Sequence, residues 1–143
     1  MSTLCSYSNQ SLLSPSAFSL LKLCLVLNSG YADLHKKSSL IKRDYSGDGT
    51  YFTPDRDACT KRGDTSSEND MIASLSKYQF GQDTDEAAMC GKCVKVTGPK
   101  GSVVVLIRDL CGSCRGGDID LTPAAFKKIA NLKDGRVKVT WKQ

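Results

Sequence analysis

The residues in this sequence best suited to chemistry by type and spacing are its cysteines. Two residues separate Cys90 from Cys93 and Cys111 from Cys114, and seventeen residues lie between the two pairs. This spacing is compatible with a four-cysteine zinc ribbon, in which four thiolates close a structural metal site. The alternative is a set of disulfides that also draws on Cys59 and forms in an oxidising compartment.

Disulfides account better for the five cysteines that follow Arg43. Their odd number and the apolar run at residues 103–107 between the pairs do not suit a zinc ribbon. A β domain of this size has a limited core, and each bridge adds about 2–4 kcal/mol of stability. We therefore expect disulfides, no metal and no cofactor. The sequence does not reveal the pairing or the fate of the odd cysteine.

The N-terminus has the features of a secretory signal peptide over residues 1–32. Residues 12–27 are mostly apolar, and Gly30 and Ala32 have the spacing that signal peptidase accepts, so cleavage is expected after Ala32. A buried helix or membrane anchor is the alternative, but the run is shorter than the roughly 18 apolar residues needed to cross a bilayer. Cys5 and Cys24 would leave with this segment and take no part in the fold.

Residues 33–43 are predicted to be a propeptide. They end in Lys42-Arg43, a dibasic pair of the kexin type that suggests a eukaryotic secretory route such as that of fungi. The alternative is a flexible linker. His35 is the only histidine and would be lost with this segment. A domain without histidine has no His-based triad, so a catalytic cysteine is not expected.

The charge distribution argues against nucleic acid as a partner. The formal net charge is +5, but the first 43 residues hold five Lys or Arg and one Asp, whereas the remainder holds fifteen Lys or Arg and fourteen Asp or Glu. The domain after Arg43 is therefore nearly neutral and lacks the basic footprint that phosphate binding needs. A monomer is the default expectation.

Short strands dominate the predicted secondary structure. Residues 93–97 and 136–141 alternate apolar and polar side chains, and residues 103–107 form a continuous apolar run typical of a strand covered on both sides. A turn at residues 98–101 joins two of these strands. The side chains expected to point inward are Val94, Val96, Val137, Val139 and Trp141.

One helix is predicted between the last two of these strands. Thr122 is the expected N-cap and Pro123 the first helical residue, Phe126, Ile129 and Ala130 form the apolar stripe, and Asp134-Gly135 ends the helix. Residues 56–70 are polar without periodicity. They are predicted to form a surface loop tied at Cys59.

Five stretches, in order, carry a family resemblance: residues 49–52, 90–96, 107–114, 118–126 and 135–141. Together they resemble the double-psi β-barrel of the expansin and rare lipoprotein A superfamily, with the greatest similarity to single-domain secreted fungal proteins of the loosenin type and with papain-inhibitor-like barrels as near relatives. The resemblance implies a mainly β fold over residues 44–143. Its form is a six-stranded double-psi β-barrel with one or two short helices and disulfides.

The resemblance also implies a site. The acid needed for wall loosening in expansin-like proteins corresponds to Asp120, while Asp109 and Thr50 correspond to residues lining the same groove. A carboxyl that is partly desolvated and hydrogen-bonded can have a raised pKa and donate a proton to a glycosidic oxygen. The more ordinary interpretations are that Asp109 accepts backbone N–H groups and that Asp120 stabilises the dipole of the following helix.

Three further residues are candidates for binding sugar. Tyr51 and Tyr78 could stack on sugar rings, although aromatic residues in strands more often belong to the core. Asp118 lies one pleat step from Asp120 and could instead be a solvated loop charge. Trp141 is assigned to the core.

Loosening of cell-wall polysaccharide without hydrolysis is the predicted function. Hydrolysis needs two carboxyl groups about 5.5 Å or about 6.5–9.5 Å apart, and the expected second acid has no clean match, since Asp55 and Asp57 are displaced. A weak endoglucanase, or a lytic transglycosylase, which needs one acid only, remains an alternative with Asp120 as the acid. The rival class is a cysteine-protease inhibitor or an effector that binds a host protein. An open polar groove would favour carbohydrate, and a protruding loop at residues 56–70 would favour inhibition.

Overall fold

The structure is a computed structural model that describes Cys5 and residues 43–60, 65–81 and 87–143. The chain divides into two compact units, of which the larger comprises Met1–Tyr7 and Lys42–Gln143 and the smaller Ser8–Ile41. The smaller unit and nearly all of the predicted signal peptide and propeptide lie outside the described residues. No helix in the described ranges is long and apolar enough to cross a membrane.

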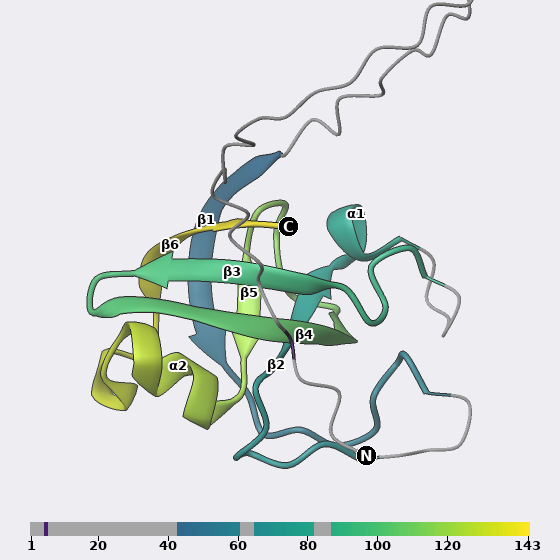
Figure 1. The fold of residues 1–143 in the computed structure, drawn as a ribbon, viewed down its shortest axis with the longest axis horizontal. Helices are drawn as coiled ribbons and strands as arrows, with labels where there is room; N and C mark the ends of the chain where they lie inside the picture. Colours follow the sequence, from purple (N-terminus) through teal and green to yellow (C-terminus); the bar gives the residue numbers. More distant parts are fainter. Residues whose placement is uncertain (1–4, 6–42, 61–64, 82–86) are drawn as a thin grey trace, which may run out of the picture. The chain divides into compact units, whose positions relative to one another are not determined.

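Six strands close into a mixed barrel in the order β1-β5-β2-β4-β3-β6 (Figure 1). The strands are β1 (Asp44–Tyr51), β2 (Ile72–Ser76), β3 (Cys93–Gly98), β4 (Gly101–Cys111), β5 (Ile119–Leu121) and β6 (Val137–Lys142). Two short helices, α1 (Lys77–Phe80) and α2 (Pro123–Ile129), lie at opposite ends of the barrel. The predicted six-stranded barrel with one or two short helices is confirmed, and the described residues contain two.

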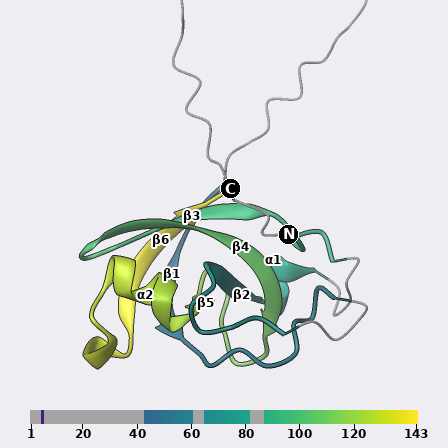
Figure 2. The same cartoon turned by 60° about the horizontal axis from the view of Figure 1, so that its bottom comes forward.

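Alternating side chains fill the barrel from β3 and β6. Val94, Val96, Val139 and Trp141 are buried as predicted, whereas Val137 is only half-buried at the start of its strand. The predicted strand at residues 103–107 is the middle of the longer β4. Its residues Val105 and Ile107 are fully buried, and their neighbours are half-buried. Figure 2 shows the curvature of β4 across the barrel.

Helix α2 begins as predicted, with Thr122 as N-cap and Pro123 at its first turn, and it ends earlier than predicted. Its C-cap residue Ala130 has extended backbone angles, and a separate 3-10 turn, η1 (Leu132–Asp134), follows. Asn131 and Asp134 form a reciprocal capping box around that turn. This local hydrogen bonding starts a new turn instead of continuing α2.

Gly117, in the loop before β5, packs directly against the backbone of Ser46 on β1. Gly117 has φ +91°, and a Cβ atom there would lie 2.3 Å from the Ser46 carbonyl oxygen. The Trp141 Nε1–H donates to the Gly117 carbonyl at 2.8 Å, and the Trp141 ring stacks on Tyr45. The core position predicted for Trp141 is confirmed, and its indole also holds the loop that leads to Asp118 and Asp120.

Three disulfides are present, which confirms disulfides over a zinc ribbon for the described cysteines. The pairs are Cys59–Cys90, Cys111–Cys114 and Cys5–Cys93. In the uncleaved chain Cys5 is the partner of Cys93, the cysteine left over in the domain. The expectation that Cys5 takes no part in the fold depends on removal of the leader, which stays a prediction. Cys93 lies on β3 beside the outward-facing Lys95 and Thr97, where a segment from outside the barrel can reach it. Cys24 lies outside the described residues.

Candidate functional site

The predicted site residues Thr50, Asp120 and Asp109 lie in one line across neighbouring strands. Thr50 on β1 is paired with Asp120 on β5, Asp120 is paired with Ser74 on β2, and Ser74 is paired with Asp109 on β4. Adjacent strands are about 4.8 Å apart, so the line spans roughly 14 Å. We call Thr50, Asp120, Ser74 and Asp109 the polar row.

A β-bulge brings Asp109 into this row. The pairing of β2 with β4 runs from Ala73 and Ile107 directly to Ser74 and Asp109, which leaves Arg108 as the extra residue. With strict alternation Asp109 would share the inward face of Val105 and Ile107. The bulge reverses that alternation, as bulges do when they re-aim a side chain. Leu110, paired with Leu75, then packs against the core.

Asp120 on β5 is hydrogen-bonded to its partner across the strand pair, Thr50. Thr50 Oγ1 donates to its Oδ1 at 2.6 Å. Burial raises the pKa of Asp120 above its ordinary value of 3.8, and the negative charge of Asp109 acts in the same direction, whereas the Thr50 hydrogen bond and the Arg136 charge oppose the rise. A half-buried carboxyl with a raised pKa retains its proton to higher pH and can serve as a hydrogen-bond donor or acid.

Asp109 accepts a backbone hydrogen bond and also has a raised pKa. Its Oδ1 accepts the Ala58 backbone N–H at 3.0 Å, which fits the more ordinary interpretation of this residue. Burial also raises the pKa of Asp109, and Asp57 adds to the rise, while the backbone N–H groups of Ala58 and Leu110 oppose it. Both aspartates of the row are therefore harder to ionise than a solvated aspartate.

Asp118 anchors the turn that delivers β5. Its Oδ1 accepts the Asp48 backbone N–H at 2.8 Å, and its Oδ2 accepts the Arg115 backbone N–H at 2.9 Å. Both carboxylate oxygens are therefore engaged with backbone. Asp118 positions Asp120, two residues further along, and is less available to bind sugar than the sequence suggested.

The two candidate tyrosines lie on opposite sides of the row. Tyr51 directly follows Thr50, is 39% exposed and rests against Phe126 at 5.1 Å between ring centroids. Tyr78 is 72% exposed on α1, beyond the end of β2. Because β1 and β2 run in opposite directions, their carboxyl ends lie at opposite ends of the barrel, as Figure 1 shows for α1 and α2. Neither ring is simply core.

Asp57, one of the two displaced acids, is held in an ion pair. Its side chain is 1% exposed, and its Oδ2 accepts from Arg108 Nη2 at 3.0 Å and from Ser66 Oγ at 2.7 Å. Arg108 is the residue of the bulge, so this pair ties the loop after β1 to the bulge that orients Asp109. An acid committed to a guanidinium is poorly placed to activate a water. Asp55 is exposed.

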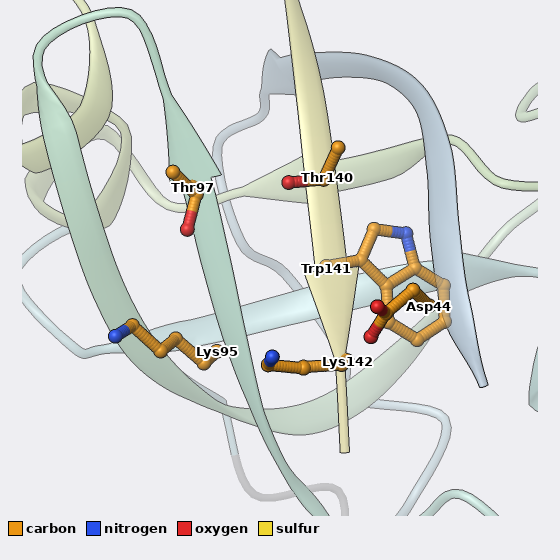
Figure 3. A pocket seen from close by; sticks show the side chains of 6 residues that line it. All are labelled: Asp44, Lys95, Thr97, Thr140, Trp141 and Lys142. Atoms are coloured by element: carbon orange, nitrogen blue, oxygen red, sulfur yellow. The ribbon is translucent and has the colours of Figure 1, made fainter. Parts of the chain in front are cut away.

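A second polar surface lies away from the row. Figure 3 shows a depression on the outer side of β3 and β6. It is lined by Asp44, Lys95, Thr97, Thr140, Trp141 and Lys142. Lys95 is paired with Lys142 and Thr97 with Thr140, so each strand presents one ammonium and one hydroxyl group. The sequence does not reveal this surface, because the pairing of β3 with β6 is not predictable from either strand alone.

Comparison with known proteins defines the class to which this barrel belongs. The family described as "Lytic transglycolase" matches residues 51–141, and the chain is a member of this double-psi β-barrel family, within the expansin-like superfamily. The match spans β2, β3, β4, β5 and α2 and includes Asp109 and Asp120. Thr50 lies one residue before it.

Particular relatives include an expansin and a protease inhibitor. The chain is 42% identical over 57 residues to Expansin-YoaJ of Bacillus subtilis, which is 40% of this chain and only 25% of that protein. It is 34% identical over 105 residues to the papain inhibitor of Streptomyces mobaraensis, covering 71% and 73% of the two chains. The solved structure of the Streptomyces papain inhibitor has a TM-score of 0.62 at 28% identity, covering 70% of this chain and 93% of that one.

A more distant solved structure has the same fold. It is a mutant of Clavibacter michiganensis expansin in complex with cellohexaose, with a TM-score of 0.60 and 22% identity over 71% of this chain and 50% of that one. Identity at this level supports the fold alone.

Proposed function

We propose that this protein is a secreted expansin-like factor that binds cell-wall polysaccharide and loosens it without net hydrolysis. The observation that carries the proposal is the hydrogen bond from Thr50 to Asp120 within a half-buried polar row that also contains Asp109. The row offers a hydroxyl and two carboxyl groups over roughly 14 Å of sheet surface, which suits the hydroxyls of an extended sugar chain. Tyr51 and Tyr78, exposed on either side, offer stacking surfaces.

The relatives support carbohydrate as the ligand class. An expansin with this fold has been solved in complex with cellohexaose, and the segment shared with the Bacillus expansin is 42% identical. We further propose that the protein belongs with the single-domain fungal proteins of the loosenin type.

The arrangement of acids favours loosening over hydrolysis. A hydrolase needs a second carboxyl group across the scissile bond to act as base or nucleophile. Asp57 is engaged with Arg108, and Asp109 accepts a backbone N–H. A single acid with a raised pKa can instead exchange hydrogen bonds with sugar hydroxyls, and that is the role we assign to Asp120.

The test compares the oxidised domain with Asp120→Asn and Asp44→Asn on cellulose and on chitin. Asp44 is a matched control because it lies on β1, six residues or roughly 20 Å from Thr50. We expect wild type and Asp44→Asn to weaken the fibre network without releasing reducing sugar, and Asp120→Asn to lose the effect. Sugar release that depends on Asp120 would instead identify a glycosidase or lytic transglycosylase. No weakening by wild type would refute the carbohydrate proposal.

Protease inhibition is the second candidate, favoured by the 34% identity to the papain inhibitor over most of both chains. Measuring the residual activity of papain titrated with wild type and with Asp120→Asn tests this candidate. Stoichiometric inhibition by both proteins would favour a surface outside the polar row. No inhibition at high excess would remove this candidate.

Secretion is part of the proposal. Residues 1–32 are proposed to be a signal peptide and residues 33–43 a propeptide cut after Lys42-Arg43. The intact mass of the exported protein tests this, since a mature chain would begin at Asp44. Retention of Cys5 on Cys93 in the exported protein would argue against removal of the leader before folding.

A further inference from the structure

The disulfide between Cys111 and Cys114 lies directly beside Asp120. Both sulfur atoms and one carboxylate oxygen of Asp120 lie within 4.8 Å of one another. Cys111 ends β4, and Cys114 belongs to the turn that leads towards β5. The carboxyl group of Asp120 therefore lies close enough to the Cys111–Cys114 disulfide that a small rotation of either side chain would bring them into contact.

This bridge constrains the chain less than the other two. Its cysteines are three positions apart, compared with 31 for Cys59–Cys90 and 88 for Cys5–Cys93. The entropy that a bridge removes from the unfolded chain grows with the length of the loop it closes. Stabilisation of the fold is therefore a weak explanation for a disulfide at this position.

The surroundings also differ from those of Cys59–Cys90. Cys59 and Cys90 pack against the hydrophobic core, whereas Cys111, although buried, and Cys114 are not among the described residues of that core cluster. Gly112, Ser113 and Arg115 are outside the core as well, and a Cβ atom added at Gly112 would meet nothing within 4 Å. Cys114 is half-buried among the exposed residues Gly112, Ser113 and Arg115, whereas Cys111 is buried, so a thiol reagent would meet Cys114 first.

We propose that Cys111 and Cys114 form a thiol–disulfide exchange site that reacts with a dithiol, and that Asp120 supplies the proton to the departing sulfur. A thiolate of the dithiol attacks Cys114 Sγ, the bond between the two protein sulfurs breaks, and its electron pair passes to Cys111 Sγ, which takes the proton of Asp120. The second thiol of the reagent, as a thiolate, then attacks the reagent's first sulfur, which is bonded to Cys114 in the mixed disulfide. This closes the reagent into a cyclic disulfide and expels Cys114 as a thiolate. The protein disulfide gains two electrons, and the dithiol is oxidised to a disulfide.

The polar and charged groups around Asp120 suit this role. Thr50 faces it from β1, Asp109 acts on it from β4 and Arg136 from the segment before β6. Burial raises the pKa of Asp120, so its proton persists to higher pH than that of a solvated aspartate, and transfer of this proton to Cys111 Sγ lets the departing sulfur leave as a neutral thiol. Ser113 Oγ lies 3.7 Å from Cys111 Sγ and adds a second polar contact.

The first experiment compares the bridges within the wild-type full chain. The oxidised protein is equilibrated with mixtures of reduced and oxidised dithiothreitol, quenched in acid, alkylated and analysed by peptide mass spectrometry. We expect Cys111 and Cys114 to become alkylated at a ratio of reduced to oxidised reagent about tenfold lower than Cys59 and Cys90. Opening of Cys59–Cys90 at the same or a lower ratio would overturn the proposal, and this readout needs no variant to fold.

The second experiment tests Asp120 through the pH profile of the reduction rate. Below the pKa of Asp120, the disulfide of Asp120→Asn should open roughly tenfold more slowly than that of wild type, because the acid is missing. Above the pKa of Asp120 the difference should vanish or reverse, since an ionised carboxyl next to a forming thiolate is unfavourable. Asp44→Asn should follow wild type throughout. A ratio of variant to wild-type rate that does not change with pH would exclude proton transfer from Asp120.

Discussion

Thr50 Oγ1 donates a hydrogen bond of 2.6 Å to Asp120 Oδ1 across the parallel pairing of β1 and β5. The two residues are 70 positions apart in the chain, and their contact exists because β5 lies between β1 and β2 in the barrel. This bond is among the interactions that favour the ionised form of Asp120, while burial opposes it. The protonation state of Asp120 therefore depends mainly on one hydroxyl group acting against desolvation.

Replacing Thr50 by Val removes this donor while keeping the shape of the side chain. The pKa of Asp120 should rise further, because burial then acts with less opposition. Any activity that needs protonated Asp120 should extend to higher pH than in wild type. NMR titration of the Asp120 carboxyl carbon measures the shift directly. Thr53→Val is the control, since Thr53 Oγ1 bonds the exposed Glu68 instead, and an unchanged titration in Thr50→Val would contradict this account.

The sequence predicted the elements that carry the site but not the contacts between them. Alternation revealed β3 and β6, and Thr122-Pro123 revealed the start of α2, because these signals are local. Ser74 and the bulge at Arg108 could not be predicted, since strand register depends on the whole barrel.

Long-range pairing of charges and cysteines was equally hidden. Asp57 resembles an ordinary loop charge in the sequence, and only the folded loop brings it to Arg108. The Cys5–Cys93 bridge spans 88 positions and could not be chosen among the possible pairings. The resemblance to a family supplied Asp120, Asp109 and Thr50, and the structure brings these three residues into one row.

Asp120→Asn should stabilise the fold at neutral pH. The folded-state pKa of Asp120 is raised above 3.8, so the folded protein binds this proton more tightly than the unfolded chain does. Stability from this group is complete below the unfolded-state pKa and is lost as pH rises through the folded-state pKa. Urea unfolding at about pH 7 should give a higher unfolding free energy for Asp120→Asn, and the gain should disappear near pH 3. A gain that persists in acid would exclude desolvation as its cause.

Breaking the Asp57–Arg108 ion pair should destabilise the protein and loosen the site. Arg108→Ala leaves a carboxylate whose side chain is 1% exposed without its cation, at a cost of about 3 kcal/mol. The pair also anchors the bulge that orients Asp109, so proteolytic cleavage in residues 56–60 should become faster. Arg56→Ala, at an exposed position, is the control and should change the unfolding free energy by less than about 0.5 kcal/mol. Equal effects of the two substitutions would show that the pair contributes nothing specific.

If residues 1–43 are removed during export, the mature protein should carry one reactive thiol. Cys93 then has lost Cys5, while the Cys59–Cys90 and Cys111–Cys114 bridges remain. Thiol titration of the secreted protein under denaturing conditions should give one equivalent, and Cys93→Ser should reduce it to zero. The absence of a thiol in a monomeric wild-type protein would mean that the N-terminal segment is retained.

Gly117→Ala should severely destabilise the loop before β5. Its φ of +91° is strained for alanine, and the added Cβ would lie 2.3 Å from the Ser46 carbonyl oxygen, where only backbone could yield. Because Trp141 holds the same residue through its carbonyl, the loop cannot move away without breaking that bond. We expect a loss of about 3 kcal/mol or failure to fold. Gly116→Ala is the matched control, since its nearest atom is the Gln79 amide nitrogen at 3.5 Å. Thermal unfolding distinguishes the two variants. Equal melting temperatures would show that the close approach of Gly117 to Ser46 leaves room for an alanine side chain.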